Sequence, residues 1–227
     1  MFESATVKLN RNIVEHGLVK LTWGNGSVFD RDNETVYIKP SGVDVFDMIV
    51  NDISNVNMDG VHLSGKKPSV DTDIHLELYK SVTFNSINSI VHTHSKYCTI
   101  FAQMQSDIPA LGTTHADYFY GDIPVVGQLT PDEIENDYEK NTGRSVVNHF
   151  IKNKINPLNI PAALLPQHGL LTWGETADKA LENAIVAELC AEMAYKQLQL
   201  CSKKHMNIHL LNKHFLRKHG TTKYYGQ

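Results

Sequence analysis

Two histidines one residue apart, His92 and His94, end the apolar segment 89–94. Successive side chains of a β-strand point to opposite faces, so residues two positions apart point the same way. On a buried strand both imidazoles therefore face one place in space, as two ligands of a metal ion must. A third histidine, His168, follows a second apolar run at 162–165 and precedes Gly169.

Imidazole is the usual nitrogen ligand of zinc, and three protein ligands with one open position are typical of a catalytic rather than a structural site. We therefore predict a divalent metal site, with zinc as the preferred ion. Asp71 is the candidate fourth ligand, and Asp73 is the alternative, unless it is an acidic residue at a helix N-terminus. The chain contains 12 histidines, so spacing alone leaves a chance grouping open.

Composition restricts the class of protein. The chain has 227 residues, 41% of them hydrophobic, which suits one globular domain spanning residues 1–227. A net charge of -4 without a long Lys/Arg run argues against a nucleic-acid partner. Three widely spaced cysteines predict a reducing compartment rather than a disulfide framework. With neither a signal-like N-terminus nor an apolar stretch of ~20 residues, we expect a cytoplasmic protein with no membrane partner.

The periodicity of apolar residues predicts both helices and strands. Helices are expected over 2–16, 71–83, 99–105, 177–200 and 210–219, with helical pieces within 131–150. Strands are expected at 19–23, 27–30, 35–39 and 86–94, and a strand–turn–strand unit over 162–173. Thr176 is the expected N-cap of the longest helix. Mixed elements in this order predict α/β layers without a regular βαβ repeat.

Three glycine-containing loops carry polar groups. Asn25 and Gly26 lie between predicted strands, where Asn-Gly favours a tight hairpin turn over an anion-binding loop. The segment 39–42, Lys-Pro-Ser-Gly, combines a cation, a hydroxyl and a glycine backbone, and the segment 65–69, Gly-Lys-Lys-Pro-Ser, repeats that chemistry. Each alone is typical of a surface turn, but three in one chain indicate a site for an oxyanion. None matches a Walker loop or a dinucleotide fingerprint.

Candidate acid/base groups lie in two places. The segment 113–121, Thr-Thr-His-Ala-Asp-Tyr-Phe-Tyr-Gly, contains Asp117, and the tail contains Tyr224 and Tyr225. A tyrosine has a pKa near ~10, so it is mostly a proton donor unless a cation lowers that pKa. The tyrosines next to Asp117 are also consistent with ordinary aromatic packing on a strand.

Several segments, in this order, carry a resemblance to a known family. They are Leu21-Thr-Trp-Gly-Asn, Ile38-Lys-Pro-Ser-Gly-Val, Lys66-Lys-Pro-Ser, Ile90-Val-His-Thr-His-Ser, Gly112-Thr-Thr-His-Ala-Asp-Tyr-Phe-Tyr-Gly, Lys213-His-Phe-Leu-Arg-Lys-His-Gly and the terminal Tyr-Tyr-Gly-Gln. Over nearly the whole chain they resemble the L-ribulose-5-phosphate 4-epimerases of the class II aldolase superfamily. The His-Thr-His motif marks the superfamily, whereas the segment 112–121 and the tail are more specific to the epimerase branch.

The resemblance implies roles for individual residues. It implies that a divalent ion, usually zinc, is held by His92, His94, His168 and Asp71. It implies a phosphate and substrate pocket formed by Asn25, Lys39, Ser41, Gly42 and Ser69, with Glu139 near it. It also implies an acid/base pair, Asp117 and Tyr225, supported by His214 and Arg217.

The resemblance further implies a fold and an activity. The expected fold is a three-layer α/β/α sandwich with a mixed, mostly antiparallel sheet, assembled as a homotetramer with sites between neighbouring subunits. The expected activity is metal-dependent interconversion of L-ribulose 5-phosphate and D-xylulose 5-phosphate at C4, by retro-aldol cleavage and rejoining of the C3–C4 bond. The alternatives are a sugar-phosphate aldolase of the fuculose- or rhamnulose-phosphate type and a non-enzymatic metal-containing module that binds sugar phosphates. The aldolases resemble one another in carrying glutamate at the position of Asp71. The aspartate of this chain therefore favours the epimerase.

One position departs from the family pattern. Members usually carry two adjacent serines after Lys-Lys-Pro, whereas this chain has Ser69 followed by Val70. Valine cannot donate a hydroxyl hydrogen bond. The departure leaves the metal ligands intact and makes the choice of sugar phosphate the least determined part of the prediction.

Overall fold

The computed structural model describes residues 1–201, 206–221 and 223–225. Within them a seven-stranded sheet has the order β4-β3-β2-β1-β5-β7-β6. The strands are β1 (Asn25–Asp30), β2 (Thr35–Ile38), β3 (Ser54–Asn57), β4 (His62–Ser64), β5 (Ser89–Thr93), β6 (Ala162–Leu165) and β7 (Gly169–Gly174). Every pairing between these strands is antiparallel, and one isolated bridge, Val125 with Leu164, is parallel. The expected mostly antiparallel sheet is confirmed.

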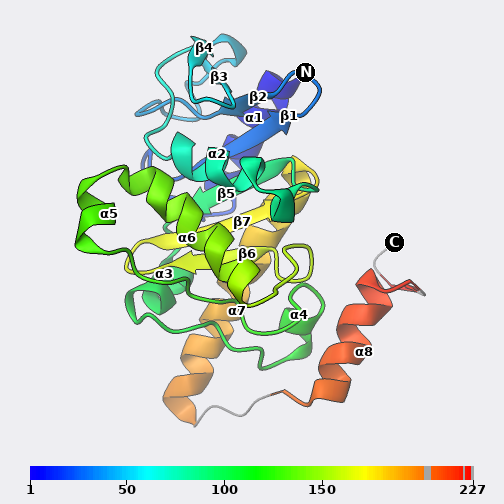
Figure 1. Cartoon of the computed structure of the whole chain (residues 1–227). Coiled ribbons are helices and arrows are strands. Elements are labelled where there is room, and N and C mark those ends of the chain that lie inside the picture. Colours follow the sequence, from blue (N-terminus) through cyan, green and yellow to red (C-terminus); the bar gives the residue numbers. More distant parts are fainter. Residues whose placement is uncertain (202–205, 222, 226–227) are drawn as a thin grey trace.

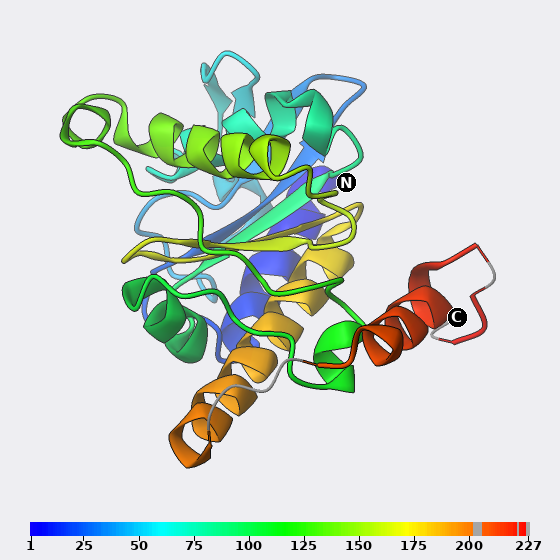
Figure 2. The ribbon, with the colours of Figure 1, turned by 60° about the horizontal axis from the view of Figure 1, so that its bottom comes forward.

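Helices cover both faces of this sheet, which confirms the expected three-layer α/β/α arrangement. The helices are α1 (Phe2–Glu15), α2 (Thr72–Lys80), α3 (Lys96–Gln103), α4 (Thr113–Ala116), α5 (Pro131–Glu135), α6 (Tyr138–Lys152), α7 (Ala177–Leu200) and α8 (Ile208–His219), with short 3-10 helices η1 (Val50–Asp52) and η2 (Val82–Phe84). Helices α2 and α6 pack together on one face, and α1, α3 and α7 lie on the other (Figure 2). Helix α8 packs against α4 at one end of the molecule (Figure 1).

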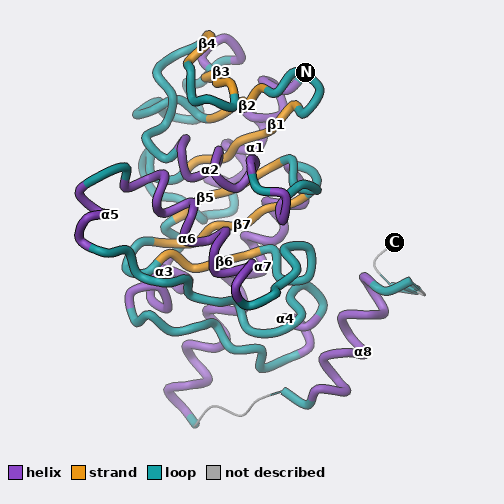
Figure 3. The backbone as a smooth tube through the Cα atoms, in the orientation of Figure 1, coloured by secondary structure: helices purple, strands orange, loops and turns teal. Residues whose placement is uncertain are grey.

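The register of β1, β5 and β7 determines which residues lie next to His92. Asn25 of β1 lies directly opposite His92 of β5, and His92 lies opposite Leu171 of β7 on the other side. All five residues of β5 are buried, as the apolar segment predicts. Short connections join β1 to β2 and β6 to β7 (Figure 3), because antiparallel neighbours need no crossover helix.

Helix α7 matches its predicted bounds, 177–200, and Thr176 caps it by accepting a hydrogen bond from the Lys179 amide at 3.2 Å. Its buried face consists mainly of alanines spaced three or four residues apart: Ala180, Ala184, Ala187, Ala191 and Ala194. Such small side chains let the helix lie close to the sheet. Leu189 and Met193, whose spacing along the helix continues the apolar series and predicts burial, are instead 45% and 43% exposed.

Two local predictions are wrong. Residues 19–23 form no strand, because Leu21 adopts a left-handed backbone conformation, with φ of 54°, and the Trp23 amide donates to the Lys20 carbonyl in a turn. Asn25 and Gly26 are not a hairpin turn but the first two residues of β1, and Gly24, with φ of 77°, makes the bend before them. No helix among the described residues is long and apolar enough to cross a membrane.

Candidate active site

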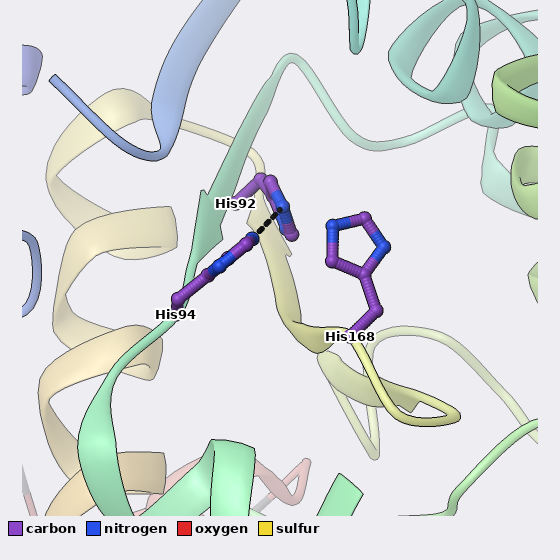
Figure 4. A group of neighbouring side chains, drawn as sticks. All are labelled: His92, His94 and His168. Carbon is purple, nitrogen blue, oxygen red and sulfur yellow. Dashed lines mark hydrogen bonds between the residues drawn. The ribbon is translucent and has the colours of Figure 1, made fainter. Parts of the chain in front are cut away.

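The three predicted metal ligands converge. His92 is on β5, His94 follows that strand by one residue, and His168 lies in the turn between β6 and β7. One ring nitrogen of each lies within 4.8 Å of the others, and the Nε2 atoms of His92 and His94 are 3.2 Å apart (Figure 4). The strand alternation that predicted this pair is confirmed.

The imidazoles are held in the neutral form that a metal requires. Burial lowers the pKa of His92 and of His94 below the usual 6.5. Burial, with His92 and His94 as neighbours, lowers the pKa of His168 to about 4. At neutral pH each ring therefore keeps a free lone pair, and three such nitrogens are a donor set that fits a zinc ion.

Gly169 allows the β6–β7 turn to approach β5. A Cβ atom at this position would lie 2.5 Å from the Thr93 carbonyl oxygen and 3.1 Å from Cδ2 of His94. Both distances are shorter than ordinary contacts, so a larger residue would push His168 away from the other two ligands. The glycine that follows His168 in the sequence is thus part of what assembles the triad.

A second group of polar side chains borders the triad. The Asn25 amide donates to Asp71 Oδ2 at 2.6 Å and to Ser69 Oγ at 3.2 Å. Burial raises the pKa of Asp71, but the nearby His92 and His75, with the Asn25 hydrogen bond, outweigh this and lower it below 3.8. Asp71 therefore stays ionised next to the histidines, although it lies outside the set of three convergent ligands. The alternative, Asp73, is exposed in the first turn of α2.

The two lysine-containing loops lie side by side. Pro40 and Pro68 form an isolated antiparallel bridge, and the Ser41 amide donates to the Lys67 carbonyl at 2.9 Å. Ser41 and Gly42 are exposed, and Gly42 adopts a φ of 69°. The segments 39–42 and 65–69, each predicted to offer polar groups, thus lie together next to Ser69.

Lys39 is buried to 4% exposure, and its Nζ donates to the carbonyl oxygens of Thr22 at 3.2 Å and Pro40 at 3.4 Å. Burial lowers its pKa below 10.5, while the more distant Asp44 and Asp71 oppose that shift. None of the described carboxylates forms an ion pair with it. A buried ammonium without such a partner favours a bound anion.

The predicted acid/base residues form a separate cluster. Asp117, at the C-cap of α4, accepts hydrogen bonds from His214 Nδ1 at 3.0 Å and from Arg217 Nη2 at 3.2 Å. The Arg217 guanidinium lies 4.3 Å from the ring centre of Tyr225, and His219 Nε2 donates to the Asp117 carbonyl at 2.9 Å. The structure therefore brings Asp117, His214, Arg217 and Tyr225 together. The last two residues of the Tyr-Tyr-Gly-Gln motif lie outside the described residues.

Within one chain, this cluster lies at the end of the sheet away from the triad. His168 comes just after β6 ends, whereas Tyr120 donates to the carbonyl of Asn159, which comes before β6 begins. Tyr118 hydrogen-bonds Glu182 in α7, which follows the far end of β7. In Figure 1, α4 and α8 likewise lie away from the β6–β7 turn. The described part of a single chain thus holds the two halves of the predicted site apart.

A further residue beside the triad, Tyr138, begins α6 and was not predicted from the sequence. Its hydroxyl lies 3.4 Å from His168 Nδ1, and the two rings stack with centres 6.3 Å apart. Glu139, a predicted substrate residue, follows it in the first turn of the helix and is half-buried. Only the position of Tyr138 beside Glu139 in the sequence could have drawn attention to it.

Comparison with known proteins agrees with this geometry. Residues 4–195 match the family described as the class II aldolase and adducin N-terminal domain, and the chain belongs to that family. It is 44% identical over 220 residues to L-ribulose-5-phosphate 4-epimerase UlaF of Salmonella paratyphi B (strain ATCC BAA-1250 / SPB7), covering 96% of this chain and 95% of that protein.

Two solved structures show the same fold at lower identity. An L-fuculose 1-phosphate aldolase matches with a TM-score of 0.78 and 24% identity, over 94% of this chain and 93% of its own. The L-fuculose-1-phosphate aldolase of Thermus thermophilus matches with a TM-score of 0.67 and 20% identity, over 90% and 98% of the two chains.

Proposed function

We propose that this protein is an L-ribulose-5-phosphate 4-epimerase, which interconverts L-ribulose 5-phosphate and D-xylulose 5-phosphate. The observation that carries the proposal is the identity of 44% to an L-ribulose-5-phosphate 4-epimerase over nearly the full length of both chains. The convergence of His92, His94 and His168 supports it, because inversion at C4 by breaking and rejoining the C3–C4 bond places negative charge on substrate oxygens.

The residues that would hold the metal are His92, His94 and His168, with Asp71 as the fourth ligand. A divalent cation, for which we propose zinc, supplies Lewis acidity that stabilises this negative charge. The nitrogen donors are neutral, so one carboxylate leaves the loaded site with a net positive charge. That charge suits a substrate that becomes more anionic during the reaction.

The polar groups next to the metal ligands would bind the substrate. Asn25, Ser69 and the exposed loop at Ser41 and Gly42 offer hydrogen bonds to its phosphate and hydroxyl groups, and Lys39 supplies positive charge. Their support is the contact between the two lysine-containing loops and the hydrogen bond from Asn25 to Ser69. Together these groups would hold the cleaved aldehyde fragment in place so that it turns over without leaving.

Asp117 and Tyr225 would exchange protons with the C4 oxygen from opposite faces of the aldehyde. His214 and Arg217 support them, since both donate hydrogen bonds to Asp117. Glu139 would lie near the substrate at the start of α6.

A second copy of the chain would complete the site, because one copy holds the two halves apart. We propose a homotetramer in which Asp117 and Tyr225 of one subunit serve the metal ligands of a neighbour. Exposed apolar side chains on α7 and α8 support an interface there: Leu189, Met193, Leu210 and Leu216. The three free cysteines support a reducing, cytoplasmic location.

The test is incubation of the zinc-loaded protein with L-ribulose 5-phosphate, with a coupled assay for D-xylulose 5-phosphate. His94→Ala should lose zinc and turnover together, and His62→Ala, an exposed residue of β4, should retain both. Release of free dihydroxyacetone and glycolaldehyde phosphate without a C4 epimer would indicate an aldolase instead. Bound zinc without any turnover would indicate a binding module.

A further inference from the structure

Tyr138 touches a metal ligand without being one. It begins α6, and both its hydroxyl and its ring contact His168: the hydroxyl lies 3.4 Å from Nδ1, and the ring planes are inclined by 29°. The residue is half-buried, in the wall of a cavity of about 330 Å³ that His168, Thr142 and Gln167 also line. The hydroxyl therefore meets the side of His168 that faces away from the other two histidines.

The partner of one imidazole nitrogen decides what the other nitrogen can do. A neutral ring carries its proton on one nitrogen and a free lone pair on the other. In His92, Nδ1 lies 3.0 Å from the carbonyl oxygen of Leu170, which can only accept, so Nδ1 holds the proton. Its Nε2 is then free to bind a metal, and this atom faces His94.

His168 has the same arrangement with a different partner. One of its ring nitrogens points toward His92 and His94, and the other points away from them (Figure 4). The nitrogen that points away is Nδ1, which lies next to Tyr138. A hydroxyl oxygen can accept the Nδ1 proton, as the Leu170 carbonyl does for His92.

We infer that Tyr138 is a positioning residue for the metal: its hydroxyl accepts the Nδ1 proton of His168 and so directs the Nε2 lone pair to the ion. This inference rests on the metal site of the proposed function. Replacing a group that orients a metal ligand in this way typically costs roughly 10–100-fold in metal affinity or activity.

A phenol suits this role because it stays neutral. Burial raises the pKa of Tyr138 above 10, and the more weakly acting Glu139 and Asp71 raise it further, although a hydrogen bond with Thr142 opposes them. A neutral acceptor orients His168 without changing the charge of the site. Thr142 also donates from Oγ1 to the Tyr138 carbonyl at 2.8 Å, which fixes the first turn of α6.

The test compares Tyr138→Phe, which keeps the ring and removes the hydroxyl, with Tyr195→Phe. Tyr195 is a half-buried tyrosine of α7 whose ring contacts that of Tyr97 at a tilt of 50°. Zinc affinity is measured by competition with a chromophoric chelator, and the Tm of the metal-free proteins is measured in parallel. We expect Tyr138→Phe to bind zinc about 10-fold more weakly, with an unchanged metal-free Tm, and Tyr195→Phe to match the wild type.

Equal zinc affinity of the wild type and Tyr138→Phe would overturn the role of Tyr138 and leave the proposed function standing. An equal loss in Tyr195→Phe would also overturn it. A wild-type protein that binds no zinc would overturn the metal site of the proposed function as well.

A measurement on the zinc-loaded wild type needs no folded Tyr138 variant. Long-range 1H–15N spectra of the imidazoles distinguish a protonated nitrogen from a metal-bound one, and the His168 signals are those lost in His168→Gln. A protonated Nδ1 and a metal-bound Nε2 are expected. The reverse assignment would show that Tyr138 does not accept from Nδ1.

Discussion

Nη2 of Arg217 donates to both carboxylate oxygens of Asp117, each at 3.2 Å. The same guanidinium lies 4.3 Å from the ring centre of Tyr225, and the Tyr225 amide donates to the Arg217 carbonyl at 3.1 Å. One side chain of α8 thus contacts both members of the proposed acid/base pair, through an ion pair and a cation–π contact. The relative position of Asp117 and Tyr225 therefore depends on how α8 packs against α4.

We predict that Tyr225→Phe lowers kcat at least about 10-fold, because general acid–base groups typically contribute more than that. Zinc content and oligomeric state should not change, since the ring remains to stack on Arg217. The adjacent Tyr224 provides a matched control, because it is 62% exposed and its ring lies near Lys213 instead. Tyr224→Phe should have wild-type kcat in the coupled assay, and equal losses in both variants would argue against a specific role for Tyr225.

Gly169→Ala should disturb the metal site through packing alone. Its Cβ would overlap the Thr93 carbonyl at 2.5 Å, so the β6–β7 turn must move and His168 with it. Overpacking of this kind typically costs about 1–3 kcal/mol. Urea unfolding should show that loss, and elemental analysis should show less zinc per chain.

Gly127→Ala is the control for that substitution. A Cβ at Gly127 meets nothing within 4 Å, so stability and zinc content should stay at the wild-type level. Full zinc content in Gly169→Ala would mean that the turn adjusts without moving His168.

Local patterns were enough for the longer helices and for the pairing of His92 with His94. Helix α7 could be placed to the residue because Thr176 caps it and apolar positions continue to Leu200. His92 and His94 could be paired because strand alternation is a local rule. By contrast, β3, β4 and the four-residue α4 were not predicted, since short elements carry too few residues to show a period.

The remaining features depend on contacts between distant parts of the chain. Asn-Gly at 25–26 has the composition of a turn, yet Asn25 pairs with His92 in the sheet and reaches Asp71 with its amide. The hydroxyl of Tyr138 lies next to His168, although the two residues are 30 positions apart in the sequence. No local sequence pattern indicates this contact. Sheet register determines the first contact and helix packing the second. The periodicity of a single sequence carries no information on either register or packing.

Acid should destabilise the metal-free protein, in part through His75. This residue is fully buried, with Nδ1 2.7 Å from Ser27 Oγ, and burial lowers its pKa to about 3. In the unfolded chain His75 binds a proton near pH 6.5, whereas in the folded protein it does so only near pH 3. The free energy of unfolding therefore falls as the pH drops through this window. One such group contributes a slope of about 1.4 kcal/mol per pH unit.

Urea unfolding of the metal-free protein at pH 7 and pH 5 measures this slope. His75→Gln should have a shallower slope than the wild type, whatever its stability at pH 7. His62→Gln should keep the wild-type slope, because His62 is exposed. Identical slopes in the wild type and His75→Gln would assign the acid sensitivity to other groups.

Val70→Ser should tighten substrate binding. Val70 is 65% exposed and directly follows Ser69, whose Oγ accepts from the Asn25 amide and from the Asp71 backbone amide. Ser69 Oγ thus accepts two hydrogen bonds and keeps one proton to donate, and a serine at position 70 would add a second hydroxyl donor for the phosphate. One such hydrogen bond contributes about 1 kcal/mol, which corresponds to a roughly 5-fold lower KM for L-ribulose 5-phosphate at unchanged kcat. Val70→Ala, which trims the side chain without adding a donor, should keep the wild-type KM. A higher KM in Val70→Ser would mean that the phosphate lies elsewhere, because an added donor at the phosphate site cannot weaken binding without displacing a better one.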